Sequence, residues 1–357
     1  MIPMKKVDIV LLATVVILTI FGLFMIYDVS SFAAYRDFGD KYHFAKDQFF
    51  WIVLGFLGLL FFANFNYHKL HNLSLPILLI AIVLLVLVFI PGIGVKLLGA
   101  TRWINLGGVF LQPAEFVKLA LAIYLSAWMS HKERGRLAAF LLLLGLVFFL
   151  VILQPDMGTA AVIISEALVI YFLSGGNIFY FVFLIPVLAG LAYALIKIAP
   201  YRLARLEMFF NASGDIETSS YHVRQILIAF GAGGLMGVGL GNSLQKYAYL
   251  PESTTDSIFA IIAEELGYVG ASILIFLFII VLWRGFYIAV RARDNLGKLL
   301  AGGITTFLAV QTIINLAAQT VLLPLTGIPL PFISYGGSAL IVDLCAVGIL
   351  LNISKNS

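Results

Sequence analysis

The sequence predicts an all-α integral membrane protein that crosses the bilayer about ten times. Of its 357 residues, 62% are hydrophobic and only 11% are charged, whereas an ordinary soluble domain is about 45–50% apolar and about 25% charged. A soluble fold cannot cover this much apolar surface, so lipid must solvate most of it. Because backbone groups in hydrocarbon must pair within their own segment, helices are the expected spanning structure.

Ten apolar runs are candidates for these helices, since a span needs about 20 mostly apolar residues. We see no internal repeat and no soluble domain, and therefore treat 1–357 as a single transmembrane domain. The first run follows two lysines without a small-residue cleavage site, so we expect an uncleaved first span. The runs lie at 8–28, 48–64, 73–92, 113–130, 137–153, 158–174, 177–198, 258–283, 298–323 and 335–353.

The distribution of basic residues predicts that both termini are cytoplasmic. The short turn at 131–136 is densely basic, as is typical of loops retained in the cytoplasm. This orientation makes 199–257 a large extracytoplasmic loop between the seventh and eighth spans. Its part at 226–240 is glycine-rich, which favours an interfacial or re-entrant segment. If that part did span, there would be eleven spans and one terminus would change sides.

Composition also excludes several function classes. A single cysteine, Cys345, rules out an intramolecular disulfide framework and a cysteine-rich metal site. The net charge of +4 is small and in a membrane protein reflects loop topology, so we predict no nucleic-acid partner. Nucleotide-binding and G-x-S-x-G motifs are absent. The histidines are too scattered for a metal site: His43, His68, His71, His131 and His222.

Four segments carry polar residues that connectors do not need, and the first is 102–118. Pro113 suits the first turn of a helix, which places Glu115 in that turn and Lys118 on the same face. The two charges then form either a helix-start pair with a snorkelling lysine or a pair facing a cavity with a charged ligand. Arg102, beside Trp103, suits a phosphate because guanidinium binds phosphate in bidentate fashion.

The second and third segments place carboxylates at helix starts. Asp156 follows a proline and either caps the next helix or belongs to a site. Asp256 stands where a span begins on the predicted outer face, and capping is again the alternative. Glu264 and Glu265 follow two turns later at membrane depth, where ionisable residues are by default functional candidates.

The fourth segment, 323–338, contains three prolines and three glycines in an otherwise apolar stretch. Irregular backbone at membrane depth is tolerated only where protein buries it or a cavity exposes it. We therefore predict a re-entrant loop lining an outer cavity, with an ordinary hairpin as the alternative. All four segments lie on the predicted outer side, and Arg224 adds a third cation there. Together they suit an amphiphile with an anionic head.

These motifs resemble the SEDS family, the RodA/FtsW/SpoVE proteins of bacterial shape, division and sporulation. The resemblance covers nearly the whole chain, and six motifs occur in the family's order. One departure is at Ser253 and Thr254, where the family usually has Ala-His, so a role for that histidine does not transfer. The motifs lie at 102–103, 112–118, 154–159, 250–256, 263–267 and 327–338.

The resemblance implies a peptidoglycan glycosyltransferase in the bacterial cytoplasmic (inner) membrane. Such proteins polymerise lipid II, a disaccharide-pentapeptide on undecaprenyl pyrophosphate, and work with a class B penicillin-binding protein. The short N-terminus favours the elongation branch, RodA. The rival hypotheses are a lipid II flippase, with Glu115, Lys118 and Glu264 along the translocation path, and a non-catalytic scaffold.

For the glycosyltransferase we predict Asp256 as the general base that takes the proton of the acceptor hydroxyl. A cationic side chain or a divalent cation (Mg or Mn), whose ligands the sequence does not identify, would stabilise the departing pyrophosphate. Glu115 would hold Lys118 in place. The predicted substrate-binding residues are Arg102, Glu115, Lys118, Arg224, Glu264 and Ser334.

Overall fold

The computed structural model describes residues 7–97, 100–105, 107–131, 136–177, 179–180, 190, 221–247 and 250–356. Most of the seventh predicted span and the first part of the predicted outer loop lie outside these residues. The described elements are α1 (Ile9–Phe38), α2 (His43–Asn64), α3 (His68–Leu87), β1 (Gly94–Leu97), β2 (Ala100–Asn105), β3 (Phe110–Leu111), α4 (Pro113–Met129), α5 (Leu137–Leu153), α6 (Met157–Leu173), α9 (Tyr221–Gly233), α10 (Ile258–Arg291), α11 (Asn295–Gln319) and α12 (Gly337–Asn356).

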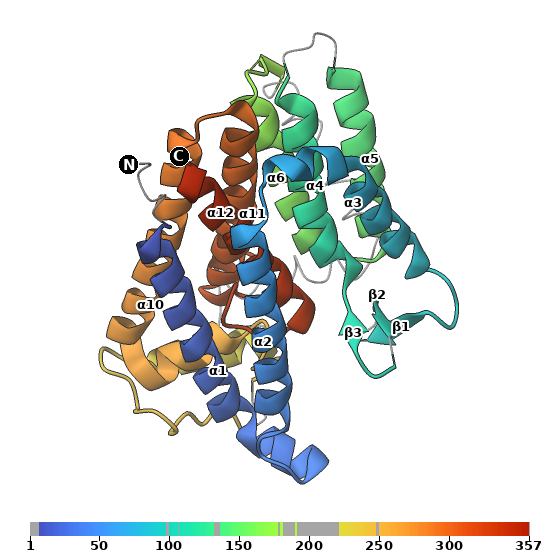
Figure 1. Ribbon diagram of the computed structural model, residues 1–357. Helices are drawn as coiled ribbons and strands as arrows, with labels where there is room; N and C mark the ends of the chain where they lie inside the picture. The colour runs from blue at the N-terminus through green and yellow to red at the C-terminus, as the bar shows by residue number, and fades with distance from the viewer. Residues whose placement is uncertain are drawn as a thin grey trace.

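The helices form a bundle suited to a multi-pass membrane protein (Figure 1). Within the described residues, six helices are long and apolar enough to cross a membrane: α1, α2, α3, α10, α11 and α12. The most apolar windows of α11 and α12 are 78% and 83% buried, against 22% for α2 and 28% for α3. The centre of the bundle is therefore α11 and α12, while α2 and α3 present their apolar faces outward.

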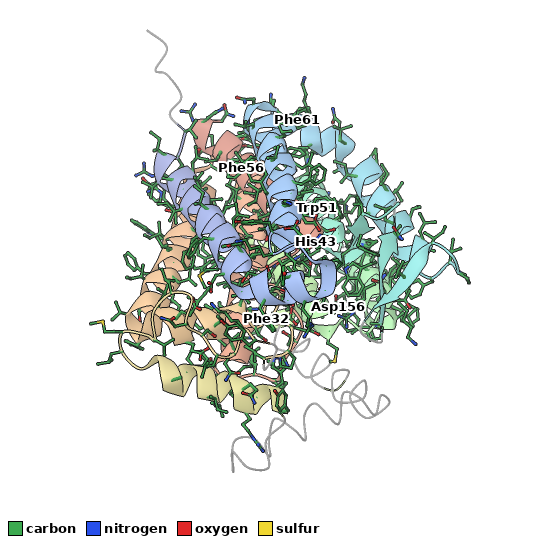
Figure 2. The ribbon with its side chains drawn as sticks, turned by 90° about the horizontal axis from the view of Figure 1, so that it is seen from below. Phe32, His43, Trp51, Phe56, Phe61 and Asp156 are labelled. Carbon is green, nitrogen blue, oxygen red and sulfur yellow. The ribbon has the colours of Figure 1, made fainter. Side chains whose placement is uncertain are left out.

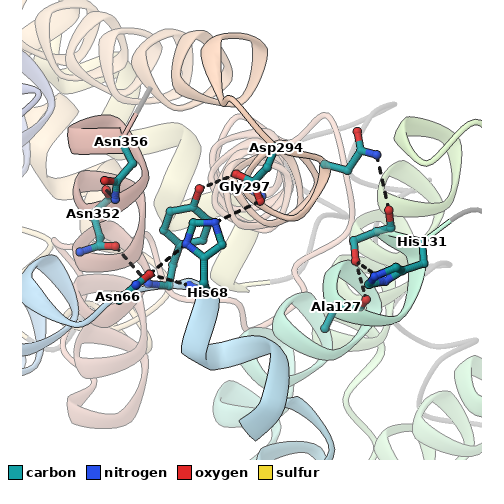
Figure 3. A network of polar contacts seen from close by, with 11 residues as sticks. Asn66, His68, Ala127, His131, Asp294, Gly297, Asn352 and Asn356 are labelled. Carbon is teal, nitrogen blue, oxygen red and sulfur yellow. Dashed lines mark hydrogen bonds and ion pairs between the residues drawn. The ribbon is translucent and has the colours of Figure 1, made fainter.

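The two ends of the chain meet at one end of the bundle (Figure 1). The backbone N–H of Asp8 donates to Ser354 Oγ at 3.2 Å. At this end, Figure 3 shows a polar network that includes Asp294 and Asn352. Within it, the Tyr67 hydroxyl donates to Asp294, and the Tyr67 N–H donates to Asn352 Oδ1 at 3.1 Å. The network joins the α2–α3 turn to α11 and α12.

A three-stranded antiparallel sheet, β1-β2-β3, lies at the opposite end. The prediction of purely helical structure missed it, because strands of four, six and two residues are too short for a clear alternating pattern. The third predicted span also extended too far along the chain. Helix α3 ends at Leu87, and Gly92, with φ of 90°, turns the chain into β1.

Helix α10 is broken at Gly267, which has φ of 67° and ψ of −169°. The segment after α9 supplies the missing backbone partners. The N–H groups of Val238 and Gly239 donate to the carbonyls of Glu264 and Glu265, each at 3.0 Å, and Tyr268 N–H donates back to the segment at 2.9 Å. Helix α9, as described, has 13 residues, and the interfacial or re-entrant placement of 226–240 stays a prediction.

Candidate functional site

A cavity of about 1020 Å³ opens at the end of the bundle that carries the sheet. Its walls come from the end of α1 and the first turns of α2, from β2 and the residues between β2 and α4, from α9, from the segment before α10 and from the segment between α11 and α12. Figure 2 views the molecule from this end, with His43 and Trp51 on α2. The lining is rich in rings, namely Phe38, Phe44, Phe50, Trp51, Trp103, Phe110 and Tyr335, and its ionisable residues are His43, Asp47, Arg102, His222, Glu252 and Asp256.

Arg102 and Asp256, 154 positions apart in the chain by number, flank Gly327 in the cavity wall. A Cβ on Gly327 would lie 3.4 Å from Asp256 Oδ2 and 4.0 Å from Arg102 Nη1. Gly327 also has φ of 75°, a conformation that residues with a side chain rarely adopt. The glycine therefore lets the carboxylate and the guanidinium approach one another without a side chain between them.

The Arg102 guanidinium is oriented by carbonyl groups of the turn before α6. Its Nε donates to Gln154 O at 3.0 Å and its Nη2 donates to Pro155 O. Next to this turn, Asp156 caps α6 by accepting from Thr159 N–H at 3.0 Å. The capping interpretation of Asp156 is thus confirmed. By capping α6, Asp156 also supports the adjacent turn whose carbonyl groups orient Arg102.

Asp256 does not act as the N-cap of α10. The cap position belongs to Ser257, which makes no side-chain capping bond. Ser257 Oγ instead lies 2.8 Å from His222 Nε2 of α9. In the sequence, His222 is one of five scattered histidines, and nothing there signals a contact across 35 positions.

Glu115 and Lys118 form the predicted pair, with Lys118 Nζ 2.7 Å from Glu115 Oε2. Both side chains are 1% exposed. Lys118 Nζ also donates to Gln311 Oε1 at 2.6 Å. The pair therefore points into the bundle core rather than snorkelling to an interface, and neither residue lines the cavity. Direct contact of these two residues with a ligand stays a prediction.

Glu264 and Glu265 hold the segment that crosses the break in α10. Glu264 accepts from the Ser243 hydroxyl. Glu265 Oε1 lies 3.2 Å from Lys246 Nζ, which also contacts Asp28 of α1 at 3.1 Å. Neither glutamate lines the cavity. Their contacts with Ser243 and Lys246 give a structural reason for carboxylates at this depth.

The last two predicted residues lie next to the cavity wall rather than in it. Arg224 is half-buried on α9 and follows the lining residues His222 and Val223. Ser334 Oγ donates to Thr255 O at 2.6 Å and accepts from Leu330 N–H at 2.8 Å. Ser334 therefore joins the α11–α12 segment to the residues just before Asp256.

Tyr335 is a wall residue that the sequence analysis did not single out. Burial and the neighbouring Asp47 carboxylate raise the pKa of Tyr335 to about 12. The phenol is therefore protonated at neutral pH. Its hydroxyl can serve as a hydrogen-bond donor in the cavity wall, and it lies 3.5 Å from Asp47 Oδ2. The irregular segment that carries Tyr335 and Gly327 lines the cavity, as predicted for 323–338.

The profile of the family described as "Cell cycle protein" (FtsW/RodA/SpoVE) matches residues 8–357. The chain belongs to this family. Among SEDS relatives, it is 42% identical to stage V sporulation protein E of Bacillus subtilis, over 98% of this chain and 97% of the relative. It is 40% identical to the probable peptidoglycan glycosyltransferase FtsW of Trichlorobacter lovleyi, over 98% of this chain and 94% of the relative.

Solved structures have the same fold. A structure described as "Structural coordination of polymerization and crosslinking by a peptidoglycan synthase complex" aligns with a TM-score of 0.80 at 25% identity, covering 98% of each chain. The crystal structure of Thermus thermophilus rod shape determining protein RodA aligns with a TM-score of 0.72 at 25% identity, covering 98% of this chain and 97% of that one. The fold is therefore that of the SEDS proteins.

Proposed function

We propose that this SEDS protein is a peptidoglycan glycosyltransferase that polymerises lipid II in the cavity between β2, α9 and the α11–α12 segment. The observation that carries the proposal is the juxtaposition of Asp256 and Arg102 across Gly327 in the wall of that cavity. One group can accept a proton and the other can bind a phosphate. The names of the curated relatives support the same activity.

In the proposed reaction, the 4-hydroxyl of the acceptor sugar attacks C1 of the donor sugar. Asp256 takes the hydroxyl proton while the new glycosidic bond forms. The bond between C1 and the pyrophosphate oxygen breaks, its electron pair leaves with the pyrophosphate, and the configuration at C1 inverts. Arg102, already oriented by two carbonyls, would stabilise the charge that develops on the leaving group.

The aromatic lining of the cavity suits the rest of such a substrate. Trp51, Trp103 and Phe110 line the cavity together with the ionisable groups. Sugar faces and the first isoprene units of a lipid both pack on rings, while water would solvate the free hydroxyl groups. A cavity lined by both rings and ionisable groups thus suits a substrate with an apolar tail and a polar head.

The requirement for a divalent cation is a separate proposal. The described residues contain no group of three or more His, Cys, Asp or Glu side chains suited to a metal ion. We therefore derive no step through a protein-bound metal. A cation carried by the pyrophosphate itself would need few protein ligands, and chelation followed by re-addition of Mg²⁺ or Mn²⁺ tests this requirement.

The cellular role proposed here is cell elongation beside a class B penicillin-binding protein, with both termini in the cytoplasm. The solved relatives include a rod shape determining protein and a peptidoglycan synthase complex, whereas curated relatives bear division and sporulation names. Depletion in a rod-shaped host separates the branches: rounded cells support elongation, and filaments or failed spores overturn it.

The decisive test is polymerisation of purified lipid II by the wild type and by Asp256→Asn, each alone and with a penicillin-binding protein unable to polymerise. Asparagine keeps the shape of the side chain but cannot take the proton, so we expect a loss of about 10²–10⁴-fold. Full activity of a well-folded Asp256→Asn protein would refute the base assignment. Lipid II exchange between leaflets without polymer from the wild type would favour a flippase instead.

A further inference from the structure

The backbone carbonyl of Asp256 is held by two side-chain amides of α11. Asn315 Nδ2 donates to Asp256 O at 3.1 Å, and Gln319 Nε2 donates to the same oxygen at 2.7 Å. The two residues are four positions apart and therefore lie on one face of the helix. They are 2% and 1% exposed and do not line the cavity, so they reach the site only through Asp256.

Asn315 also ties this carbonyl to the segment that carries Gly327. The second bond of its Nδ2 goes to Ile328 O at 2.7 Å. A side-chain amide nitrogen has two hydrogens. Here one is donated to the segment before α10 and the other to the α11–α12 segment. The amide of Asn315 therefore links the Asp256 backbone directly to the segment that carries Gly327.

The residues before Asp256 are held in the same way. Ser334 Oγ donates to Thr255 O at 2.6 Å, and Tyr335 N–H donates to Thr254 O at 2.9 Å. The carbonyls of 254, 255 and 256 thus all accept from α11 or from the α11–α12 segment. Because this backbone precedes the first turn of α10, its carbonyls depend on donors from other elements.

We propose that Asn315 and Gln319 are positioning residues for the transfer reaction, which fix Asp256 relative to Gly327 and Arg102. The proposal rests on the proposed function, in which Asp256 takes the proton. Neither amide touches substrate. They determine the position of the Asp256 carboxylate relative to the acceptor hydroxyl. A small misplacement of a catalytic group can lower the rate by about 10²-fold.

The test compares Asn315→Ala and Gln319→Ala with the wild type in steady-state polymerisation of lipid II. We expect kcat to fall by about 10- to 100-fold, with KM within about threefold of the wild-type value because the cavity lining is intact. Thr312→Val is the matched control. Thr312 is equally buried in α11, but its hydroxyl bonds only to Leu308 O of its own helix, so its kcat should stay close to wild type.

A double-mutant cycle separates positioning from general structural damage. If Asn315 acts through the carboxylate, Asn315→Ala should lower the residual activity of Asp256→Asn little or not at all. An equal loss in both backgrounds, or a lower folded fraction with unchanged kcat per folded molecule, would overturn the proposal. If Asn315→Ala does not fold, Gln319→Ala, which loses a donor to Asp256 O alone, decides the question by the same two readouts.

The design also keeps two failures apart. A fully active Asp256→Asn protein refutes the base assignment, whatever the α11 variants do. An inactive Asp256→Asn protein beside fully active Asn315→Ala and Gln319→Ala proteins leaves the base assignment standing and refutes the positioning role. Every comparison requires that the wild type makes polymer. If it makes none, that result counts against the proposed function before the positioning role of Asn315 and Gln319 is judged.

Discussion

Replacement of Lys118 by methionine tests how the charged core of the bundle is balanced. Lys118 Nζ lies 2.7 Å from Glu115 Oε2 and 2.6 Å from Gln311 Oε1, in a side chain that is 1% exposed. Glu166 and Asp343 are 0% exposed, and within the described residues their carboxylate oxygens have no hydrogen-bond partner. Lys118 is a cation that interacts electrostatically with both of these carboxylates as well as with Glu115.

The expected magnitude follows from the geometry. Methionine fills a similar volume, so the cost of a cavity is small. Removing one partner of a buried ion pair costs about 3–5 kcal/mol, because the other charge is left buried and unpaired. Lys118→Met should therefore lower the free energy of unfolding by about 3–5 kcal/mol. Thermal and denaturant unfolding of the purified protein in detergent measures this change.

Glu115→Gln in the Lys118→Met background should restore most of the lost free energy of unfolding. Replacing both members of a buried ion pair by uncharged residues often leaves stability unchanged or raises it by about 1–4 kcal/mol. A single Lys118→Met variant within about 1 kcal/mol of the wild type would refute the reasoning. So would a double variant no more stable than the single one. If the double variant folds but makes no polymer, the predicted binding of substrate by Lys118 gains support that stability alone cannot give.

Three further substitutions, two of them with a control variant, test individual parts of the fold by thermal unfolding. Asp156→Ala removes the cap of α6 and should cost about 1 kcal/mol, whereas Asp156→Asn, which keeps a capping oxygen, should cost less. Gly267→Ala should destabilise markedly, because its Cβ would lie 2.3 Å from a backbone nitrogen of the facing segment, while Gly145→Ala, with open space around the Cβ, should not. Glu166→Gln should match or exceed the wild type in stability, because within the described residues the buried Glu166 carboxylate accepts no hydrogen bond, and an amide costs less to bury than a carboxylate. A stable Gly267→Ala or an unstable Glu166→Gln protein would contradict these assignments.

Local chemistry made much of the bundle predictable. Apolar runs located α4, α5, α6, α11 and α12 to within a few residues, although α1 and α10 continue well past their predicted ends. Pro113 marked the start of α4, and Asp156 proved to be a cap. The spacing of Glu115 and Lys118 foretold their ion pair. Each of these features depends on residues within one or two helical turns, where sequence order and spatial order coincide.

Features set by packing between distant segments were not predictable. The i,i+3 spacing of Glu115 and Lys118 is the same whether the pair faces a cavity or the core, and only the helices around α4 decide which. The contact of His222 with Ser257 spans 35 positions, and that of Asn315 with Asp256 spans 59. The short sheet also escaped prediction because its strands have only two to six residues and are stabilised by pairing with one another rather than by a pattern within each strand.

The buried carboxylates of this protein divide into groups with different physical roles, although the sequence presents them alike. Glu265 is balanced by Lys246 and stabilises a broken helix, and Glu115 is balanced by Lys118. Asp256, by contrast, is only half-buried, lines the cavity, and has its backbone rather than its carboxylate fixed by α11. A group that must take up a proton and give it back gains from a rigid backbone and a carboxylate open to the ligand. The charges of Glu115 and Glu265 are thus held in ion pairs inside the bundle, whereas α11 fixes the backbone that carries the charge at the cavity wall.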